Sequence, residues 1–504
     1  MIEIHKTNEI YVRIVCDIST AMDLKDYLSC YIPNYRFHPK VKRKIWNGKV
    51  SFFDVRTHEL PIGLLPLFNK FCKKHKLEYK FMFDVSELYT DVTRDTIKLF
   101  SERILVKAYT TENKKIDAYD YQIDAVVSAL TNKRGILQCV TSSGKSLMLY
   151  LYIRFLLEKV PDMNFILVVP TINLVTQMYS DFSDYGWDDI QKYCTRMCTG
   201  YKPDFKKQVL ITTYQSVCKK SQSFFEKMDV LICDEAHQAK NLSIRDIAKK
   251  CINADFRLGS TGTLPTEESD RMNIFGYLGQ IIYTMGYQEL IDRDILAKMK
   301  IVNLILKYPK HIIDKNKIGG GRSYPEEKET CNTYENRNTI LKMIIENSKD
   351  NDNTLILAEN IDHLDRITTY LENVLPEKYI VVNIDGRVKT KEREIIRKSM
   401  ETETNMVLIA SYGTFSTGVS VKRIHNIIFA SSYKSKIRVL QSCGRGLRTH
   451  SSKKQLILYD IVDNLCWKKR TGNIGMNHIY KHYLERKKYY NEQGFTRIIK
   501  ELDI

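Results

Sequence analysis

From about residue 118 onward the sequence alternates short apolar runs with helical stretches, and it does so in two successive series. Short apolar runs that alternate with helices are typical of parallel strands buried on both faces of a sheet. The pattern therefore predicts an α/β protein with two parallel sheets of similar plan. The expected strands are 135–140, 165–169, 209–212, 230–233 and 257–259 in the first series, and 354–358, 379–384, 406–410, 426–430 and 455–460 in the second.

At 504 residues the chain is longer than one hydrophobic core usually supports, so several domains are expected. Short strand-like and helix-like runs are mixed before residue 90, which is typical of a small α+β domain. The sequence after about residue 464 is basic and aromatic. The expected divisions are a small α+β domain at 1–90, a linker at 91–117, a first α/β domain at 118–300, a connection at 301–330, a second α/β domain at 331–462 and a basic helical segment at 463–504.

A candidate phosphate-binding loop follows the first strand of the first series. Residues 139–146 read Cys-Val-Thr-Ser-Ser-Gly-Lys-Ser and lead into an apolar helix from Leu147. Such a turn aims backbone N–H groups at phosphate oxygens, Lys145 would neutralise the β- and γ-phosphates, and Ser146 would ligate Mg²⁺. Cys139 stands where the full Walker pattern has glycine, and a Gly-Lys-Ser triplet can also be a simple helix start. The residues expected to cradle the phosphates are Thr141, Ser142, Ser143, Gly144, Lys145 and Ser146.

A pair of acids follows another strand of the same series. Asp234 and Glu235 come directly after the apolar run 230–233, and Asp234 could hold the Mg²⁺ of a bound nucleotide. Acids at this position could also cap a helix, where the helix dipole favours negative charge. Because the loop and the acids occur in this order, each at the carboxyl end of a strand, the two together favour a nucleotide site.

The overall composition indicates a polyanionic partner. The chain has 78 Lys and Arg against 60 Asp and Glu, a net charge of +18. No apolar run is long enough to cross a bilayer, the first residues do not resemble a signal peptide, and no strongly amphipathic basic helix favours a membrane surface. The twelve cysteines are scattered, so buried reduced thiols are favoured over a zinc site. Nucleic acid is the expected partner.

One basic segment within residues 1–90 is a candidate contact for nucleic acid. Residues 37–49 contain five Lys or Arg, no acid, and aromatic residues on either side of a turn. Lysines would contact phosphates, and an aromatic ring could stack on a base. A solvated surface is the alternative interpretation. The candidate contacts are Lys40, Lys42, Arg43, Lys44, Trp46 and Lys49.

Further motifs give the chain a resemblance to a known family. Their order resembles superfamily 2 helicases and translocases across about residues 118–460. Within that superfamily, segments 35–54, 60–64, 411–418 and 434–437 resemble the UvsW branched-DNA helicases of T-even bacteriophages. The chain departs in detail, because residues 260–263 read Ser-Thr-Gly-Thr and 234–237 read Asp-Glu-Ala-His. The motifs are Tyr121-Gln122, Pro170-Thr171, 212–216, 260–263, 416–420 and 441–448.

The resemblance implies two tandem RecA-like motor domains with ATP and Mg²⁺ between them. It assigns Glu235 to orient the attacking water, Gln122 to read adenine, Tyr119 to stack on it, and Arg445 and Arg448 to act as arginine fingers. It adds Gly418 to the ATP contacts. Backbone contacts to nucleic acid are implied for Pro170, Thr171, Thr213, Gln215, Gly386, Arg387 and Thr414, and coupling between the two sites for His237, Ser260, Thr261, Thr263 and Gln441.

By resemblance, the chain is expected to be an ATP-dependent DNA helicase or translocase that acts on branched DNA in phage recombination, repair and replication. Stalled forks, Holliday junctions and R-loops would be its substrates, and the first 90 residues would grip duplex. The resemblance also implies a monomeric or weakly associating protein in the cytoplasm of an infected bacterium. An RNA or RNA–DNA helicase and the helicase subunit of a restriction system are alternatives. A scaffold with an inactive ATPase fold is disfavoured, since Lys145, Asp234, Glu235, Arg445 and Arg448 are all present.

Overall fold

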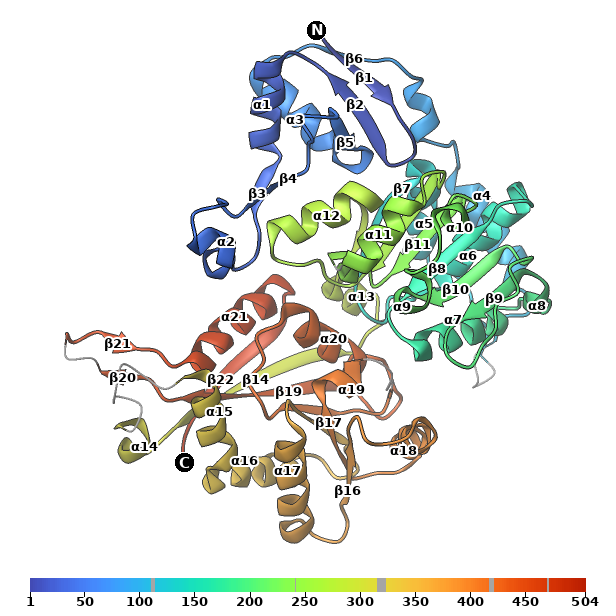
Figure 1. The fold of residues 1–504 in the computed structure, drawn as a ribbon. Coiled ribbons are helices and arrows are strands. Elements are labelled where there is room, and N and C mark those ends of the chain that lie inside the picture. The colour runs from blue at the N-terminus through green and yellow to red at the C-terminus, as the bar shows by residue number, and fades with distance from the viewer. Residues whose placement is uncertain (110–113, 241, 315–322, 417–420, 469–470) are drawn as a thin grey trace. The chain divides into compact units, whose positions relative to one another are not determined.

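The computed structural model describes residues 1–504 except 110–113, 241, 315–322, 417–420 and 469–470 (Figure 1). The chain forms two compact units, one of residues 1–139 with 143–285 and one of residues 140–142 with 286–504. Among the described residues, no helix is both long and apolar enough to cross a membrane.

The first unit begins with a small α+β domain, as the sequence predicts. Its four-stranded sheet has the order β5-β2-β1-β6, and apolar residues of the sheet pack with those of α1 and α3 in one core. A separate two-stranded ribbon, β3 with β4, carries α2 between its strands. The elements are β1 (Ile2–Lys6), β2 (Tyr11–Val15), α1 (Ile18–Tyr27), β3 (Ser29–Tyr31), η1 (Tyr35–Phe37), α2 (Pro39–Lys42), β4 (Lys49–Ser51), β5 (Glu59–Pro61), η2 (Ile62–Leu64), α3 (Leu65–His75), β6 (Tyr79–Phe81) and η3 (Val85–Leu88).

The residues expected to form a linker include a helix of 11 residues. α4 (Arg94–Ile104) packs on the domain that follows, where the ring of Phe100 meets the ring of Phe155 edge-on with centroids 5.2 Å apart. Thr93 caps this helix by accepting a hydrogen bond from the backbone of Thr96. The segment is therefore part of the first unit.

The rest of the first unit is a seven-stranded sheet in which all strands are parallel, with the order β13-β7-β12-β11-β8-β10-β9. Its central strands β8, β10 and β11 are apolar and buried in their centres, which is the expected signature of a sheet covered on both faces. The elements are α5 (Asp120–Asn132), β7 (Arg134–Cys139), α6 (Lys145–Lys159), β8 (Phe165–Val169), α7 (Ile172–Asp184), α8 (Ile190–Tyr193), β9 (Cys194–Met197), β10 (Val209–Thr213), α9 (Tyr214–Val217), α10 (Gln222–Phe225), β11 (Val230–Asp234), η4 (Ala236–Lys240), α11 (Leu242–Lys250), β12 (Phe256–Thr261), α12 (Glu268–Leu278) and β13 (Ile281–Met285).

Strand register brings the motifs of this sheet to one edge. Asp234 at the end of β11 pairs with Ser260 on β12, and Thr261 on β12 pairs with Gln138 near the end of β7. On the other side Thr213 pairs with Val169. Because parallel strands end together, each motif that follows a strand lies at the same carboxyl edge.

The α+β domain and the first large sheet are joined by partly buried polar contacts. The guanidinium of Arg134 donates to the backbone carbonyl of Glu9 at 3.0 Å and to its carboxylate at 3.1 Å. Gln280 donates to the carbonyl of Gly63 at 2.9 Å, and a Cβ on Gly63 would lie 1.9 Å from the carbonyl oxygen of Phe275. The close approach at Gly63 leaves no space for a side chain.

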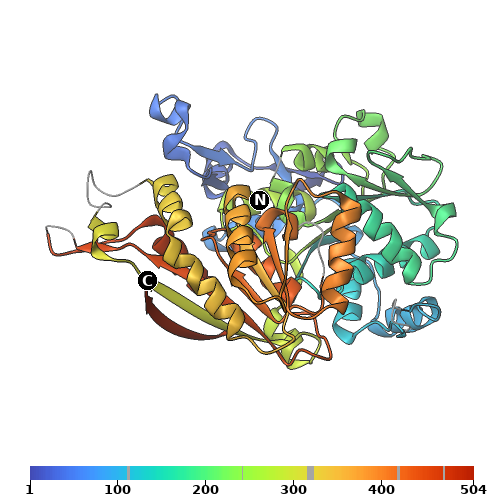
Figure 2. The same ribbon diagram turned by 90° about the horizontal axis from the view of Figure 1, so that it is seen from below.

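The second unit contains another seven-stranded, all-parallel sheet, with the order β16-β17-β15-β18-β19-β14-β22 (Figure 2). Leu304 on β14 packs in a core with residues of α16 and α17, whereas its neighbour Ile305 packs with Tyr483 of α21. Alternate residues of a strand point to opposite faces, so helices cover both faces of this sheet. The prediction of two parallel sheets is confirmed.

The elements of the second unit are α13 (Tyr287–Asp292), β14 (Lys298–Lys307), α14 (Lys310–Asp314), α15 (Tyr324–Thr333), α16 (Glu335–Glu346), β15 (Thr354–Ala358), α17 (Ile361–Val374), β16 (Ile380–Ile384), α18 (Thr390–Thr402), β17 (Met406–Ser411), α19 (Tyr412–Ser416), β18 (Asn426–Phe429), α20 (Lys436–Gly446), β19 (Gln455–Asn464), β20 (Trp467–Lys468), β21 (Ile474–Gly475), α21 (His478–Glu492) and β22 (Thr496–Asp503).

Two strands of this sheet differ from the sequence-based expectation. β14 crosses the expected boundary between 300 and 301 and pairs with β19 on one side and β22 on the other. β22 lies in the segment expected to be helical, after the helix α21. Both strands belong to the sheet only through partners distant in sequence, a relationship that local patterns do not reveal.

Candidate nucleotide and nucleic-acid sites

The candidate phosphate loop is a tight turn between β7 and α6. Ser142 and Gly144 both have left-handed backbone conformations, with φ of 69° and 78°, and α6 begins at Lys145. The Lys145 ammonium donates to the backbone carbonyl of Cys139 at 3.1 Å. Ser146 Oγ lies 2.8 Å from the hydroxyl of Tyr185 on the segment after α7. The turn therefore has the form expected of a phosphate cradle, with the lysine folded back over it.

The start of α5 supports this loop from behind. Gln122 Nε2 donates to the carbonyl of Ser143 at 3.1 Å, and Tyr121 Oη donates to the same oxygen at 2.9 Å. The other end of the Gln122 amide accepts the backbone N–H of Tyr119 at 2.9 Å. Gln122 thus contacts the loop directly, and its expected reading of adenine stays a prediction. The supporting role of Tyr121 was not indicated by the sequence, because it depends on how α5 packs against the loop.

Tyr119 is suited to the expected stacking role by its exposure. Its side chain is half exposed, and its ring lies parallel to that of Tyr121 with centroids 5.6 Å apart. One face of the Tyr119 ring therefore packs on the buried ring of Tyr121, which fixes the orientation of the opposite, exposed face.

The candidate magnesium carboxylate is held by its neighbour on β12. Ser260 Oγ donates to Asp234 Oδ1 at 2.5 Å. Burial raises the pKa of Asp234, and the adjacent Glu235 charge raises it further, whereas Lys145 and the Ser260 hydrogen bond lower it. A cation beside this carboxylate would favour its ionised form.

The available ligands fit Mg²⁺ that enters with a nucleotide. Asp234 and Ser146 offer hard oxygen ligands, which Mg²⁺ prefers. Within the described ranges, no group of three or more His, Cys, Asp or Glu residues forms a metal cage of protein ligands alone. Mg²⁺ commonly binds through one or two protein oxygens together with water and substrate phosphates.

Glu235 is connected to the third motif through a histidine. His237 Nδ1 lies 3.1 Å from Glu235 Oε2 and 3.1 Å from Thr261 Oγ1, and the histidine is buried. The backbone N–H of Thr263 donates to Thr261 Oγ1 at 3.4 Å. Glu235 itself has a left-handed φ of 51°. These contacts form a continuous chain from the expected water-orienting carboxylate to the loop after β12.

The candidate nucleic-acid contacts of the first unit follow β8 and β10. Thr171 and Thr213 each cap the helix that follows, accepting backbone N–H groups of Leu174 and Ser216 at 3.4 Å. Thr213 is buried, whereas Gln215 is exposed. The caps give these threonines a local structural role, and Pro170 is half-buried at the end of β8.

The candidate contacts of the second unit follow β16 and β17, which are neighbours. Gly386 and Arg387 are exposed, and the Arg387 guanidinium donates to the carboxylates of Asp385 and Asp365. The hydrogen bonds from Arg387 lower the pKa of Asp385. Thr414 lies in α19 and accepts a hydrogen bond from Ser411 Oγ at 2.9 Å. Gly418 lies outside the described residues.

The candidate arginine fingers lie at the end of α20. Arg445 occupies the last turn of the helix, and its guanidinium lies 6.0 Å from the centre of the Phe415 ring. Arg448 follows the helix and forms a backbone bridge with Leu296. Gln441 is half-buried one turn before Arg445. The three residues therefore share one rigid element and its immediate continuation.

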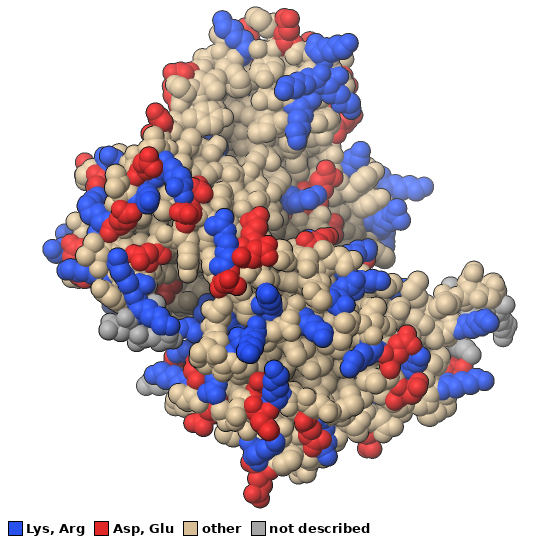
Figure 3. Space-filling model, turned by 180° about the vertical axis from the view of Figure 1, so that it is seen from behind, with Lys and Arg blue, Asp and Glu red and all other residues tan. Residues whose placement is uncertain are grey.

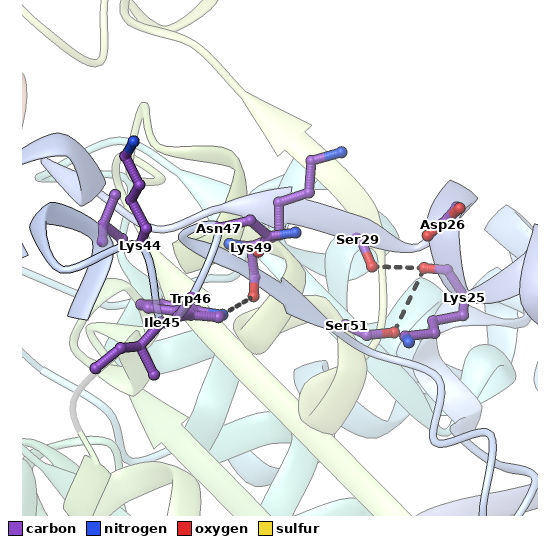
Figure 4. Close-up of a pocket in the computed structure, with 10 residues that line it drawn as sticks. Lys25, Asp26, Ser29, Lys44, Ile45, Trp46, Asn47, Lys49 and Ser51 are labelled. Atoms are coloured by element: carbon purple, nitrogen blue, oxygen red, sulfur yellow. Dashed lines mark hydrogen bonds between the residues drawn. The ribbon is translucent and has the colours of Figure 1, made fainter.

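The basic segment forms the tip of the β3–β4 ribbon. Trp46 is half-buried, and its indole N–H donates to the carbonyl of Lys49 at 2.9 Å (Figure 4). Two large apolar side chains are exposed here, Phe37 at 74% and Ile45 at 70%. A cleft of about 740 Å³ lies beside Trp46. It is lined by Lys25, Asp26, Ser29, Val41, Lys44, Ile45, Trp46, Asn47, Lys49 and Ser51.

Positive charge is not confined to this tip. Lys and Arg side chains are spread over the face shown in Figure 3, with Asp and Glu among them. At the ribbon tip, lysines lie beside the exposed apolar side chains of Phe37 and Ile45. Lys25 on α1 and the two serines of the cleft were not indicated by the sequence, because they approach the basic segment only through folding.

Three family models match the chain. Residues 1–84 match "DNA helicase UvsW, N-terminal", residues 115–266 match "Type III restriction enzyme, res subunit", and residues 335–450 match "Helicase conserved C-terminal domain". Together these matches cover the α+β domain, most of the first large sheet and most of the second.

Similar proteins include helicases and translocases. A "DNA 3'-5' translocase XPB2" of Sulfurisphaera tokodaii is 24% identical, over 69% of this chain and 82% of its own length. The crystal structure of T4 UvsW matches with a TM-score of 0.52 and 29% identity, over 100% of this chain and 99% of that chain. The "ATP-dependent DNA helicase uvsW" of Enterobacteria phage T4 is 31% identical over the full length of both chains. The chain thus belongs to the UvsW family of ATP-dependent helicases.

Proposed function

We propose that this protein is a DNA helicase and translocase that uses Mg²⁺-ATP to remodel branched DNA, namely stalled forks, Holliday junctions and R-loops. One observation carries the proposal: the Lys145 loop and the Asp234–Ser260 pair lie at the same carboxyl edge of the first large sheet. The chain is also similar to UvsW over its whole length. The similarity to a phage protein supports activity in the cytoplasm of an infected bacterium.

The chemistry follows from the residues around the loop. Lys145 leaves the carbonyl of Cys139 and neutralises the β- and γ-phosphates, while backbone N–H groups of 141–146 hold their oxygens. Asp234 and Ser146 would hold Mg²⁺, which would offset the negative charge of the phosphates. Glu235 orients the attacking water, and its contact with His237 fixes the carboxylate. Phosphoryl transfer requires mainly positioning and charge stabilisation, which this set supplies.

Arg445 and Arg448 are the proposed arginine fingers. Each presents a planar fork of donors that suits the charge spread over the transferring phosphoryl group. Since they share α20 and its continuation, one movement of that element would bring both to the nucleotide or remove both. Loss of these arginine contacts after hydrolysis is the proposed basis of the motor stroke.

The DNA contacts proposed are of two kinds. Residues after β8, β10, β16 and β17 offer hydroxyl, amide and guanidinium groups to the sugar-phosphate backbone, which carries no base identity. The ribbon tip adds lysines beside Phe37, Ile45 and Trp46, a combination suited to phosphates and unstacked bases together. Such contacts recognise DNA structure in preference to sequence.

ATP turnover with a panel of nucleic acids tests the proposal. The panel holds a Holliday junction, a fork, an R-loop, linear duplex, single strand and duplex RNA at one salt concentration. Branched DNA should stimulate turnover most. Strongest stimulation and unwinding with duplex RNA would instead identify an RNA helicase.

Substitutions at the loop and the acidic pair test the chemistry. Lys145→Ala and Glu235→Gln should each lower stimulated turnover at least about a hundredfold. Lys159→Ala removes an exposed lysine from the far end of the same helix and should change nothing. Retained turnover in the Lys145 or Glu235 variant would reject the proposed site.

A further inference from the structure

A buried lysine lies beside the element that carries the candidate arginine fingers. Lys453 is 6% exposed and sits in the turn between α20 and β19, where it forms a backbone bridge with His450. Its neighbour Lys454 is exposed. A lysine is rarely buried unless its ammonium has partners, so the environment of Lys453 requires an explanation.

The Lys453 amine bridges two backbone segments. Nζ donates to the carbonyl of Gly446 at 2.7 Å and to the carbonyl of Lys422 at 2.8 Å. Gly446 is the last residue of α20, where carbonyl groups have no partner within the helix and favour a positive charge. One side chain therefore ties the end of α20 to the segment that precedes β18.

Both segments are also held from their other sides. A Cβ on Gly446 would lie 2.6 Å from Ile427 and 3.0 Å from Leu456, so the helix end is packed tightly against β18 and β19. Glu401 on α18 accepts the backbone N–H groups of Lys422 at 2.7 Å and Arg423 at 3.3 Å. Lys453 thus connects the end of α20 with residues 422–423, and each of these segments also has contacts of its own to the rest of the second unit.

We infer that Lys453 is a positioning residue for ATP hydrolysis, which holds the end of α20, and with it Arg445 and Arg448, in register with residues 421–423. The inference rests on the proposed function, in which these arginines act on the γ-phosphate. Arg445 lies one residue before the carbonyl that Lys453 binds, and Arg448 lies two residues after it. A small displacement of Gly446 would therefore move both guanidinium groups.

The electrostatic environment makes this bridge sensitive to pH. The pKa of Lys453 is lowered to about 7, mainly by burial; Glu401 opposes this shift, and the charge of Arg448 contributes to it. A neutral amine still has two N–H donors for the two carbonyls, but it loses the charge assistance that strengthens such bonds. The charged and titratable groups around Lys453 are Glu401, Lys422, Arg423, His425, Arg448 and His450.

The test compares Lys453→Met, Lys453→Arg and Lys454→Met in the full-length protein by DNA-stimulated ATP turnover. Methionine keeps the stem of the side chain and removes the donors, so kcat should fall about tenfold with the KM for ATP changed less than about twofold. Arginine keeps donors and should restore most of kcat. Lys454→Met removes an equal charge next to the site and should leave kcat unchanged.

A pH series separates positioning from mere packing. The ratio of wild-type kcat to that of Lys453→Met should be largest below pH 7 and should decline as pH rises through it. Arginine stays protonated over this pH range, so the ratio of the kcat of Lys453→Arg to the kcat of Lys453→Met should not decline as pH rises. Lys453→Met leaves the carbonyls of Lys422 and Gly446 without this donor, so thermal unfolding of each variant checks that the fold is retained.

Wild-type kcat in Lys453→Met would overturn the inference, as would equal losses in the methionine and arginine variants, because only shape would then matter. Arg445→Ala and Arg448→Ala report separately on the proposed function. If turnover survives both arginine changes, the assigned role of the arginines fails. If it is lost in them but not in Lys453→Met, the proposed function stands and the positioning role alone is rejected.

Discussion

Ser260 and Asp234 are directly paired on neighbouring parallel strands, and the serine hydroxyl donates a 2.5 Å hydrogen bond to the aspartate carboxylate. This bond joins the candidate magnesium ligand to the motif Ser-Thr-Gly-Thr at 260–263. The same motif reaches Glu235 through Thr261 and His237. Both members of the acidic pair are therefore positioned by one strand end.

Ser260→Ala should shift the acid limb of the ATP-turnover pH profile upward. The serine bond lowers the pKa of Asp234, which burial raises, so its loss should raise that pKa further. Because the ionised carboxylate is needed and is lost as pH falls through the pKa, turnover at pH 6 should fall more than turnover at pH 8. Ser269→Ala removes another buried serine hydroxyl of the first unit and serves as the control. Equal losses at both pH values would argue against this electrostatic role.

Gly144→Ala should weaken ATP binding by at least about tenfold. A Cβ at this position would lie 2.2 Å from Gln122 Nε2, so the amide would be pushed from the Ser143 carbonyl it holds. Gly200→Ala is a matched control, since Gly200 also has a left-handed φ, of 90°, but no atom within 4 Å of a new Cβ. Both variants bear backbone strain of roughly 1 kcal/mol. Titration with a fluorescent nucleotide measures the affinity of both variants. Equal affinities would show that the contact between Gln122 and the loop does not support ATP binding.

The fold class could be predicted because the strands are themselves local signals. The apolar runs 165–169 and 354–358 coincide with β8 and β15, and the motifs fall at strand ends as expected. β14 and β22 could not be predicted in the same way. β22 has polar residues at five of its eight positions, and both strands are defined by partners far away in the sequence.

Charge patterns were the least informative part of the sequence. The basic and aromatic C-terminal segment contains Arg486, which is buried and donates to both carboxylate oxygens of Asp460 at 2.8 and 3.0 Å. Tyr490 is also buried and donates to Asp460 at 3.0 Å. Part of this charge therefore fixes α21 to the second sheet. Composition alone cannot distinguish such an arginine from one that contacts nucleic acid.

Glu9→Gln should destabilise the first unit by about 3 kcal/mol. The carboxylate pairs with both Arg134 and Lys6, and its loss leaves the largely buried guanidinium with only the charge of Asp255 to oppose its burial. Burial already lowers the pKa of Arg134, which shows that its charge is held at a cost. Chemical unfolding of the full-length protein measures the change, with Asp124→Asn at the exposed Arg94 pair as a nearly silent control.

The same contact guides how the α+β domain should be tested. Deleting residues 1–90 would remove Glu9 and expose both Arg134 and the surface that Gly63 covers. Loss of DNA binding after that deletion could then reflect damage to the first large sheet. Surface substitutions at the ribbon tip avoid this ambiguity.

Replacing Lys42, Arg43 and Lys44 together by glutamine should weaken binding to a Holliday junction and flatten its dependence on salt. All three side chains are exposed at the ribbon tip. Every phosphate that is no longer neutralised should reduce the slope of log affinity against log salt by about 0.9, so a reduction of roughly 2 to 3 is expected. Fluorescence anisotropy with a labelled junction at several salt concentrations measures the slope.

The matched control replaces Lys70, Lys73 and Lys74, three exposed lysines of α3 in the same domain, by glutamine. Both triple variants lower the net charge by three, so a purely long-range effect of charge would weaken binding equally in the two. A local contact at the ribbon tip predicts a reduced slope only in the first variant. Equal slopes in both variants and the wild type would show that the basic segment is a solvated surface, the interpretation its sequence left open.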